Sequence, residues 1–187
     1  MDKITKLQER CEALAVLVNG VKTEYSGASQ NQKAFLETVV GAAIWYLPKH
    51  TDSWTGKLSV NCLRSFHSLS NVSKPKTSEE HVLPRKIAAG RLLRLDQEVT
   101  GNLVFDSFVS EFGKFHLVLP GEIKRLQSLQ RSDLFELATK TYSSAGIHFV
   151  DVSLEELRQI KKRNDSLIEE ILEQNGFPLF DQSDDKA

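Results

Sequence analysis

The chain has 187 residues, of which 40% are hydrophobic and 26% are charged, and its formal net charge is −1. These values are ordinary for a globular protein with a sizeable core, and they give no global basic signature for nucleic acid or an anionic membrane. No apolar run reaches the roughly 18 residues of a membrane span. Cys11 and Cys62 lack the spacing of a zinc site or a disulfide framework. We therefore expect a cytoplasmic protein without a membrane partner.

The first helix is predicted from a regular spacing of apolar residues. Over residues 2–24 they recur at alternating intervals of three and four, with Leu7 and Leu14 among them, which is the pattern of a heptad repeat. Such a stripe packs either on the core of the helix's own domain or on a partner helix. In the second case Leu7 and Leu14 belong to an interface.

A second helix is predicted over residues 30–47, where a broad apolar stripe carries few charges. Pro48 ends this helix, because proline cannot continue the backbone hydrogen bonds. Trp45 and Tyr46 occupy its last turn. We expect them to be aromatic side chains at the edge of the core or a shelf for a ligand.

Two loops and a short helix follow. Residues 49–57 and 68–78 are rich in polar and loop-favouring residues and are predicted to be loops. Ser59 is predicted to cap a short helix between them.

The next region predicts two helices and the densest positive cluster of the chain. The helices cover residues 84–95, opened by Pro84, and residues 101–112. The first of them carries four cations: Arg85, Lys86, Arg91 and Arg94. This cluster indicates either a solvated face or contacts to phosphate groups.

The C-terminal third alternates strands and helices. Residues 115–119 and 147–152 are apolar runs typical of strands. One helix is predicted from Gly121, another from Ser132 to Tyr142.

A long charged helix is predicted over residues 153–175, opened by a capping box of Ser153 and Glu156. Apolar residues again recur at alternating intervals of three and four residues, which places them along one seam of the helix. Asn164 and Leu167 fall on this seam, where an asparagine can fix register and oligomeric state.

Together these elements predict an α+β fold that is mostly helical, with two or three short strands and long heptad-patterned helices at both ends. We expect one globular domain over residues 1–180, with N-terminal helices in 1–47, a site region in 79–130 and the C-terminal helix in 153–175. The acidic tail over 181–187 is predicted to be disordered. The two seam helices pair with each other or with their copies in a homo-oligomer.

The chemistry of the chain is concentrated between Glu79 and Lys86, where carboxylates, an imidazole and two cations follow one another. Histidine is the usual general base near neutral pH, a neighbouring carboxylate can hold a metal, and cations neutralise charge on a phosphate. We therefore predict a site for phosphodiester hydrolysis with His81 and Arg85 as catalytic residues. The alternative is that Glu80 and His81 cap a helix and His81 pairs with a carboxylate in a polar core.

The run from Glu80 to Pro84 resembles the opening of the HNH (His-Me finger) nuclease motif, in which an acid and a histidine precede an apolar residue and a proline. The resemblance implies a ββα unit whose two strands are the runs beginning at Glu80 and at Phe115. It also implies that His81 activates water beside a Mg²⁺ or Mn²⁺ ion. The ligands it implies are Glu80, His116 and Glu122.

His116 and Glu122 each have a second interpretation. A histidine in an apolar strand is often a hydrogen-bonded core residue, and a glutamate at a helix start is favoured by the helix dipole. The position after Glu122, where the motif would allow a ligating asparagine, holds Ile123.

Three functions follow from these patterns. The first is an HNH-like endonuclease, or a subunit of one, acting on DNA or RNA. The second is a non-enzymatic helical adaptor that binds a protein partner or its own copies through its terminal helices. The third is a nucleic-acid-binding module without catalysis that uses Arg85, Lys86, Arg91 and Arg94. We favour the first.

Overall fold

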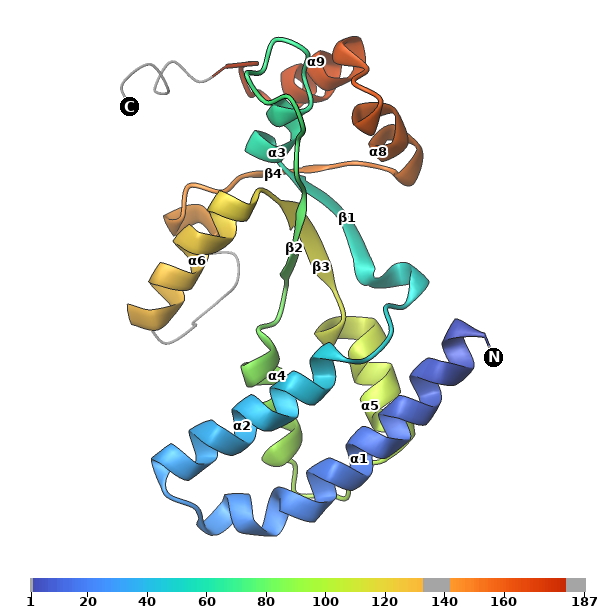
Figure 1. The fold of residues 1–187 in the computed structure, drawn as a ribbon, viewed down its shortest axis with the longest axis vertical. Coiled ribbons are helices and arrows are strands. Elements are labelled where there is room, and N and C mark those ends of the chain that lie inside the picture. Colours follow the sequence, from blue (N-terminus) through green and yellow to red (C-terminus); the bar gives the residue numbers. More distant parts are fainter. Residues whose placement is uncertain (1, 133–141, 181–187) are drawn as a thin grey trace. The chain divides into compact units, whose positions relative to one another are not determined.

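The structure is a computed structural model, and it describes residues 2–132 and 142–180. The predicted fold class is confirmed: the fold is α+β and mostly helical, with a small sheet in the order β2-β3-β1-β4 (Figure 1). The chain forms two compact units. Unit 1 contains Met1–Ser53 and His81–Phe115, and unit 2 contains Trp54–Glu80 and His116–Ala187. Residues 1–180, predicted to be one globular domain, contain all of unit 1 and most of unit 2. The tail over 181–187, predicted to be disordered, lies outside the described residues.

Unit 1 is helical, and its helix starts follow from capping residues. The Asp2 side chain accepts hydrogen bonds from the backbone N–H groups of Ile4 and Thr5, and Ser29 forms a capping box with Gln32. The elements of this unit are α1 (Lys3–Gly27), α2 (Gln30–Trp45), the short η1 (Thr51–Ser53), α4 (Arg85–Leu93), α5 (Gly101–Ser107) and the π-helix η2 (Phe108–Phe112).

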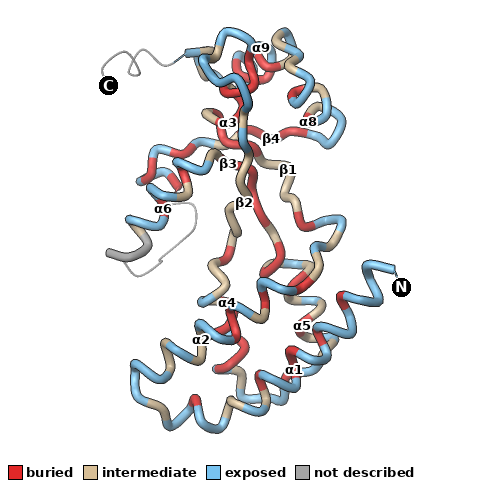
Figure 2. The backbone as a smooth tube through the Cα atoms, in the orientation of Figure 1, coloured by how far each residue is buried: buried red, intermediate tan, exposed pale blue. Residues whose placement is uncertain are grey.

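The apolar stripe of α1 faces the core of unit 1, against α2, α4 and α5 (Figures 1 and 2). Leu7 is 1% exposed and Leu14 is 4% exposed. The prediction that these two leucines lie at an intermolecular interface is therefore wrong, because the chain's own helices already cover them. The other interpretation of the stripe, packing on the core of its own domain, is confirmed.

Helices α2 and α4 approach closely because Gly41 has no side chain. A Cβ atom at this position would lie 3.3 Å from the backbone carbonyl carbon and oxygen of Arg85. The contact places the first turn of α4 beside the last turn of α2, where Trp45 lies.

Unit 2 contains most of the sheet. Its elements are β1 (Trp54–Ser59), α3 (Val60–Ser65), β2 (Ser78–His81), β3 (Phe115–Val118), α6 (Pro120–Ser132), β4 (Phe149–Asp151), α8 (Leu154–Lys161) and α9 (Asp165–Gln174). Two strand-end residues, His81 of β2 and Phe115 of β3, belong to unit 1. The helix predicted over 132–142 falls mostly outside the described residues.

Strand β1 corrects the prediction of a loop over 49–57. It pairs with β4 in antiparallel register, with Leu58 opposite Val150. A cross-strand ion pair joins Lys57 to Asp151 at 2.9 Å. The predicted cap at Ser59 is confirmed, since its hydroxyl accepts from the Cys62 N–H at the start of α3.

The prediction of a single long helix over residues 153–175 is wrong, because two helices, α8 and α9, occupy this range. The capping box of Ser153 and Glu156 is confirmed at the start of α8. Arg163 then adopts a φ of 60°, in the left-handed region that ends a helix, and Asn164 is the N-cap of α9.

Asn164 is therefore a capping residue and not a seam residue, and its side chain accepts from the backbone N–H of Leu167. Leu167 is half-buried in the first turn of α9, away from any continuous heptad seam. The helices α1 and α9, predicted to pair, belong to different units.

Candidate functional site

His81 is the last residue of β2, and Pro84 then begins the turn into α4. Its ring centroid lies 6.0 Å from that of Trp45 and 6.3 Å from that of Phe115. The Nε2 atom of His81 lies 2.7 Å from Nη2 of Arg85. A guanidinium group only donates hydrogen bonds, so Nε2 is the acceptor and carries no proton in this arrangement.

Arg85 connects His81 to a groove between α2 and α4. Its guanidinium group lies on the face of the Trp45 indole ring. The groove has a volume of about 430 Å³, and its lining includes Gly41, Ala42, Trp45, Tyr46, Arg85 and Lys86. An imidazole, two cations and two aromatic rings are therefore brought together within unit 1.

Only two of the four cations of α4 reach this groove. Arg91 makes an ion pair with Glu111 at 2.6 Å, and Arg94 makes one with Glu37 at 3.2 Å. Arg94 is the C-cap residue of α4, and its guanidinium group contacts Glu37 of α2 and the hydroxyl of Tyr25. Arg91 and Arg94, predicted to bind nucleic acid, each pair with a carboxylate of unit 1, and their side chains are 51% and 58% exposed.

His116, a predicted metal ligand, is buried in β3 of unit 2. Its Nδ1 atom lies 2.6 Å from the hydroxyl oxygen of Thr55, and its ring packs on Tyr142 and Phe149. Burial, with a smaller contribution from the nearby Lys57 charge, lowers the pKa of His116 from its ordinary value of 6.5 to about 4. These contacts agree with the interpretation of His116 as a hydrogen-bonded core residue.

Glu122, another predicted metal ligand, is 2% exposed at the start of α6. Its carboxylate accepts hydrogen bonds from the Ser59 hydroxyl at 2.6 Å, the Asn61 amide at 3.3 Å and the backbone N–H of Leu119 at 2.8 Å. The carboxylate thus caps α6 and joins it to the β1–α3 connection.

The predicted metal ligands do not form a ligand set. Glu80 is half-buried in β2, and His116 and Glu122 have the separate surroundings given above. Within residues 2–132 and 142–180 no three or more His, Cys, Asp or Glu side chains are grouped in a way that could hold a metal ion. The arrangement of these residues does not fit the predicted Mg²⁺ or Mn²⁺, and we derive no step through a metal.

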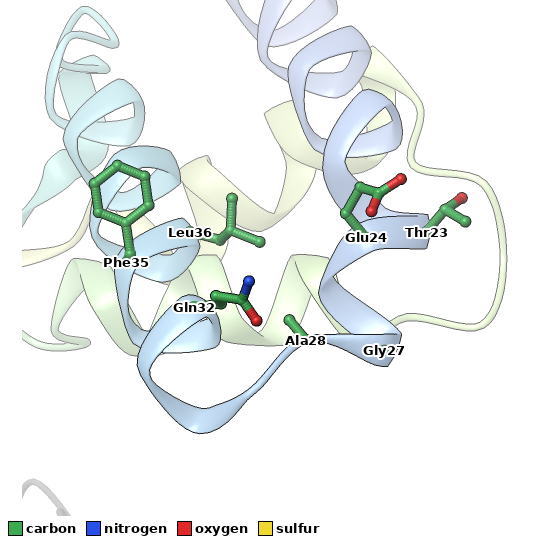
Figure 3. Close-up of a pocket in the computed structure, with 7 residues that line it drawn as sticks. All are labelled: Thr23, Glu24, Gly27, Ala28, Gln32, Phe35 and Leu36. Atoms are coloured by element: carbon green, nitrogen blue, oxygen red, sulfur yellow. The ribbon is translucent and has the colours of Figure 1, made fainter.

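A second hollow, of about 410 Å³, lies at the elbow between α1 and α2 (Figure 3). Its walls include Glu24, Gln32, Phe35 and Leu36, and Glu24 is the one titratable residue among those that line it. Because its lining contains no imidazole or cation, this hollow is a weaker candidate for chemistry than the groove beside His81.

The burial of His116 predicts a pH dependence of stability. The unfolded chain binds a proton at His116 near pH 6.5, whereas the folded chain does so only near pH 4. The contribution is therefore fully present above pH 6.5 and is lost as the pH falls toward 4, by up to about 1.4 kcal/mol per pH unit. In urea unfolding at several pH values, His116→Gln should show a shallower loss between pH 6.5 and 4 than wild type. The matched variant of an exposed histidine, His148→Gln, should keep the wild-type slope, and equal slopes in all three proteins would contradict this account.

Comparisons with known proteins add no assignment to this geometry: no family model, curated protein or solved structure matches the chain. None of the helices in the described part of the chain has both the length and the apolar character needed to cross a membrane.

Proposed function

We propose that this protein is a nuclease, or the nuclease subunit of an assembly, in which His81 is the general base. The observation that carries the proposal is the 2.7 Å contact between Arg85 Nη2 and His81 Nε2 beside an open groove. It joins an unprotonated imidazole nitrogen to a cation that can bind phosphate.

From this contact we propose the following order of steps for phosphodiester hydrolysis. A phosphodiester that enters the groove offers anionic oxygens to Arg85, whose Nη2 N–H turns from His81 to the phosphate and so frees the lone pair of His81 Nε2. His81 Nε2 can then take a proton from a water molecule as the water oxygen forms a bond to phosphorus. The ester oxygen leaves with the electron pair of the broken P–O bond and takes a proton from solvent.

The order of elements around His81 supports the same proposal. Strands β2 and β3 are neighbours in the sheet, and α6 begins two residues after β3 ends. This is the strand, strand and helix order that the HNH resemblance implies. The helices α4 and α5 lie between the two strands in the chain.

Loss of cleavage in His81→Ala is the expected test result. The purified chain is incubated with labelled DNA and RNA in Mg²⁺, in Mn²⁺ and in chelator, and His81→Ala should cleave at least about 100-fold more slowly than wild type. His148→Ala, which removes an exposed histidine, should cleave like wild type. Circular dichroism establishes that both variants are folded. A folded His81→Ala protein with wild-type activity, or a wild-type protein that cleaves nothing under any condition, would refute the proposal.

A second candidate function is nucleic-acid binding without catalysis, favoured by the two cations and two rings that line the groove. It predicts binding that weakens steeply with salt and is unchanged in His81→Ala. The cleavage assay and a binding assay on the same variant therefore separate the two candidates.

A further inference from the structure

From the groove between α2 and α4 we infer that the nucleic acid this protein binds is single-stranded, with an unpaired base stacked on Trp45 and Tyr46. This inference rests on the proposed function and names its substrate class. The nearby cations, Arg85 and Lys86, would hold the phosphate next to that base.

The exposure of the two rings is the first argument. Trp45 is 59% exposed and Tyr46 is 72% exposed, although large aromatic side chains usually lie in a core or an interface. Tyr46 is held at the end of α2 because the Arg10 side chain donates a hydrogen bond to its backbone carbonyl. The Arg85 guanidinium group covers one face of Trp45, and the remaining exposed surface of the two rings forms a stacking platform at the helix end, on which the face of any base can stack.

The floor of the groove is the second argument. Gly41 lines it, and a Cβ there would lie 3.4 Å from the backbone nitrogen of Lys86. The absent side chain lets the groove reach down to the backbone of α4. The volume of about 430 Å³ lies within the range of sites that take a small ligand, such as one base.

The charge of the groove is the third argument. Glu37 also lines it, but this carboxylate accepts a hydrogen bond from the Tyr25 hydroxyl at 2.7 Å and forms an ion pair with Arg94. Its negative charge is thus balanced inside the protein. Arg85 and the exposed Lys86 both line the groove, and their N–H donors suit the phosphate beside a stacked base.

Single-stranded substrate is favoured over duplex because of how the rings lie. In a duplex the bases are stacked on one another and their faces are hidden, so an exposed ring can reach a base face only after unpairing, which costs a few kcal/mol. In a single strand the same faces are available. The other occupant that an uncharged aromatic surface could attract is a second copy of this chain, and the test below includes it.

The test measures fluorescence polarisation of a labelled twelve-nucleotide oligo-dT strand and of a labelled duplex of equal length, in chelator, and a denaturing gel after each measurement establishes that the strands are intact. Wild type should bind the single strand at least about tenfold more tightly than the duplex. The double variant Trp45→Ala/Tyr46→Ala should lose at least about tenfold in affinity for the single strand, since stacking contributes about 1–3 kcal/mol per base. Trp45→Phe/Tyr46→Phe should retain most of it.

A matched control is Phe35→Ala, which removes another exposed ring of α2 (67% exposed) that does not line the groove, and it should bind like wild type. Equal affinity for both forms of DNA, or an alanine double variant that binds like wild type, overturns the inference. So does sedimentation that shows a wild-type dimer which the alanine double variant converts to a monomer without any change in binding, because the rings then contact a second copy.

The two proposals can fail separately. Cleavage by wild type that is unaffected in the alanine double variant refutes the stacking site and leaves the nuclease standing. Tight single-strand binding through Trp45 and Tyr46 without cleavage refutes the nuclease and supports the stacking site.

Discussion

Leu14→Asp should unfold unit 1. Leu14 is 4% exposed in a cluster of buried apolar side chains, so the substitution removes apolar contacts and places a carboxylate in apolar surroundings. The lost burial costs about 2 kcal/mol and the unpaired charge several more, together on the order of 5 kcal/mol or above. The total stability of a domain is about 5–15 kcal/mol. The expected result is loss of the α-helical signal of unit 1 in circular dichroism at neutral pH.

The matched control is Val16→Asp, two residues along the same helix. Val16 is 73% exposed, so its carboxylate stays in water and the free energy of unfolding should change by less than about 1 kcal/mol. If Leu14 were an interface residue, Leu14→Asp would give a folded monomer. A folded Leu14→Asp protein with the wild-type helical signal would therefore contradict the packing described for α1.

Glu122→Ala is expected to have the second largest effect, a loss of about 2–5 kcal/mol in the free energy of unfolding measured by urea titration. In the wild-type protein the fully buried Ser59 hydroxyl and the Leu119 N–H both donate hydrogen bonds to the Glu122 carboxylate. The variant leaves these two donors without that acceptor. A buried donor without an acceptor costs about 1–3 kcal/mol. Glu122→Gln keeps one acceptor oxygen and should lose less.

Glu155→Ala controls for the removal of a carboxylate from a helix start. Glu155 is exposed and makes an i,i+3 ion pair with Arg158, so its loss should change stability by less than about 1 kcal/mol. A Glu122→Ala protein as stable as Glu155→Ala would show that the three hydrogen bonds of Glu122 contribute little.

The elements that the sequence predicts well are those specified by local signals. Ser153 and Glu156 form a capping box, and their spacing of three residues can be recognised in the sequence. Pro84 directly precedes α4, because the fixed φ angle of proline favours the start of a helix. The stripe of α1 was correctly assigned to a helix, but its spacing is the same for a helix packed on its own core and for one packed on a partner. The choice depends on α4 and α5, which begin 58 and 74 residues after the end of α1.

Strand β1 could not be predicted from its own residues. Its sequence, Trp54-Thr55-Gly56-Lys57-Leu58-Ser59, has no regular alternation of apolar and polar side chains, and it contains a glycine with a φ of +79°. Its conformation depends on pairing with β4, about ninety residues away. The prediction for Asn164 was wrong for a different reason. The run Arg163-Asn164-Asp165 contains the signal of a helix N-cap, but the heptad spacing continues across this run and favours one unbroken helix.

The candidate site shows the same division. His81 and Arg85 are four residues apart, so their proximity could be predicted from a strand end followed by a helix start. Trp45 lies far from them in the chain and reaches Arg85 because Gly41 lets α2 and α4 approach. The sequence signal for this site was the pair of adjacent aromatic residues, Trp45 and Tyr46, at the end of an almost uncharged helix. The same pair is equally compatible with the edge of a core and with a ligand-binding surface.

The division into units has a consequence for how this protein can be taken apart. The chain passes from one unit to the other between Ser53 and Trp54, between Glu80 and His81, and between Phe115 and His116. A fragment ending at residue 53 would carry α1 and α2 without the α4 and α5 side chains that complete their core. No single cut in the gene yields either unit whole, so functional dissection has to rely on point substitutions or on two fragments expressed together.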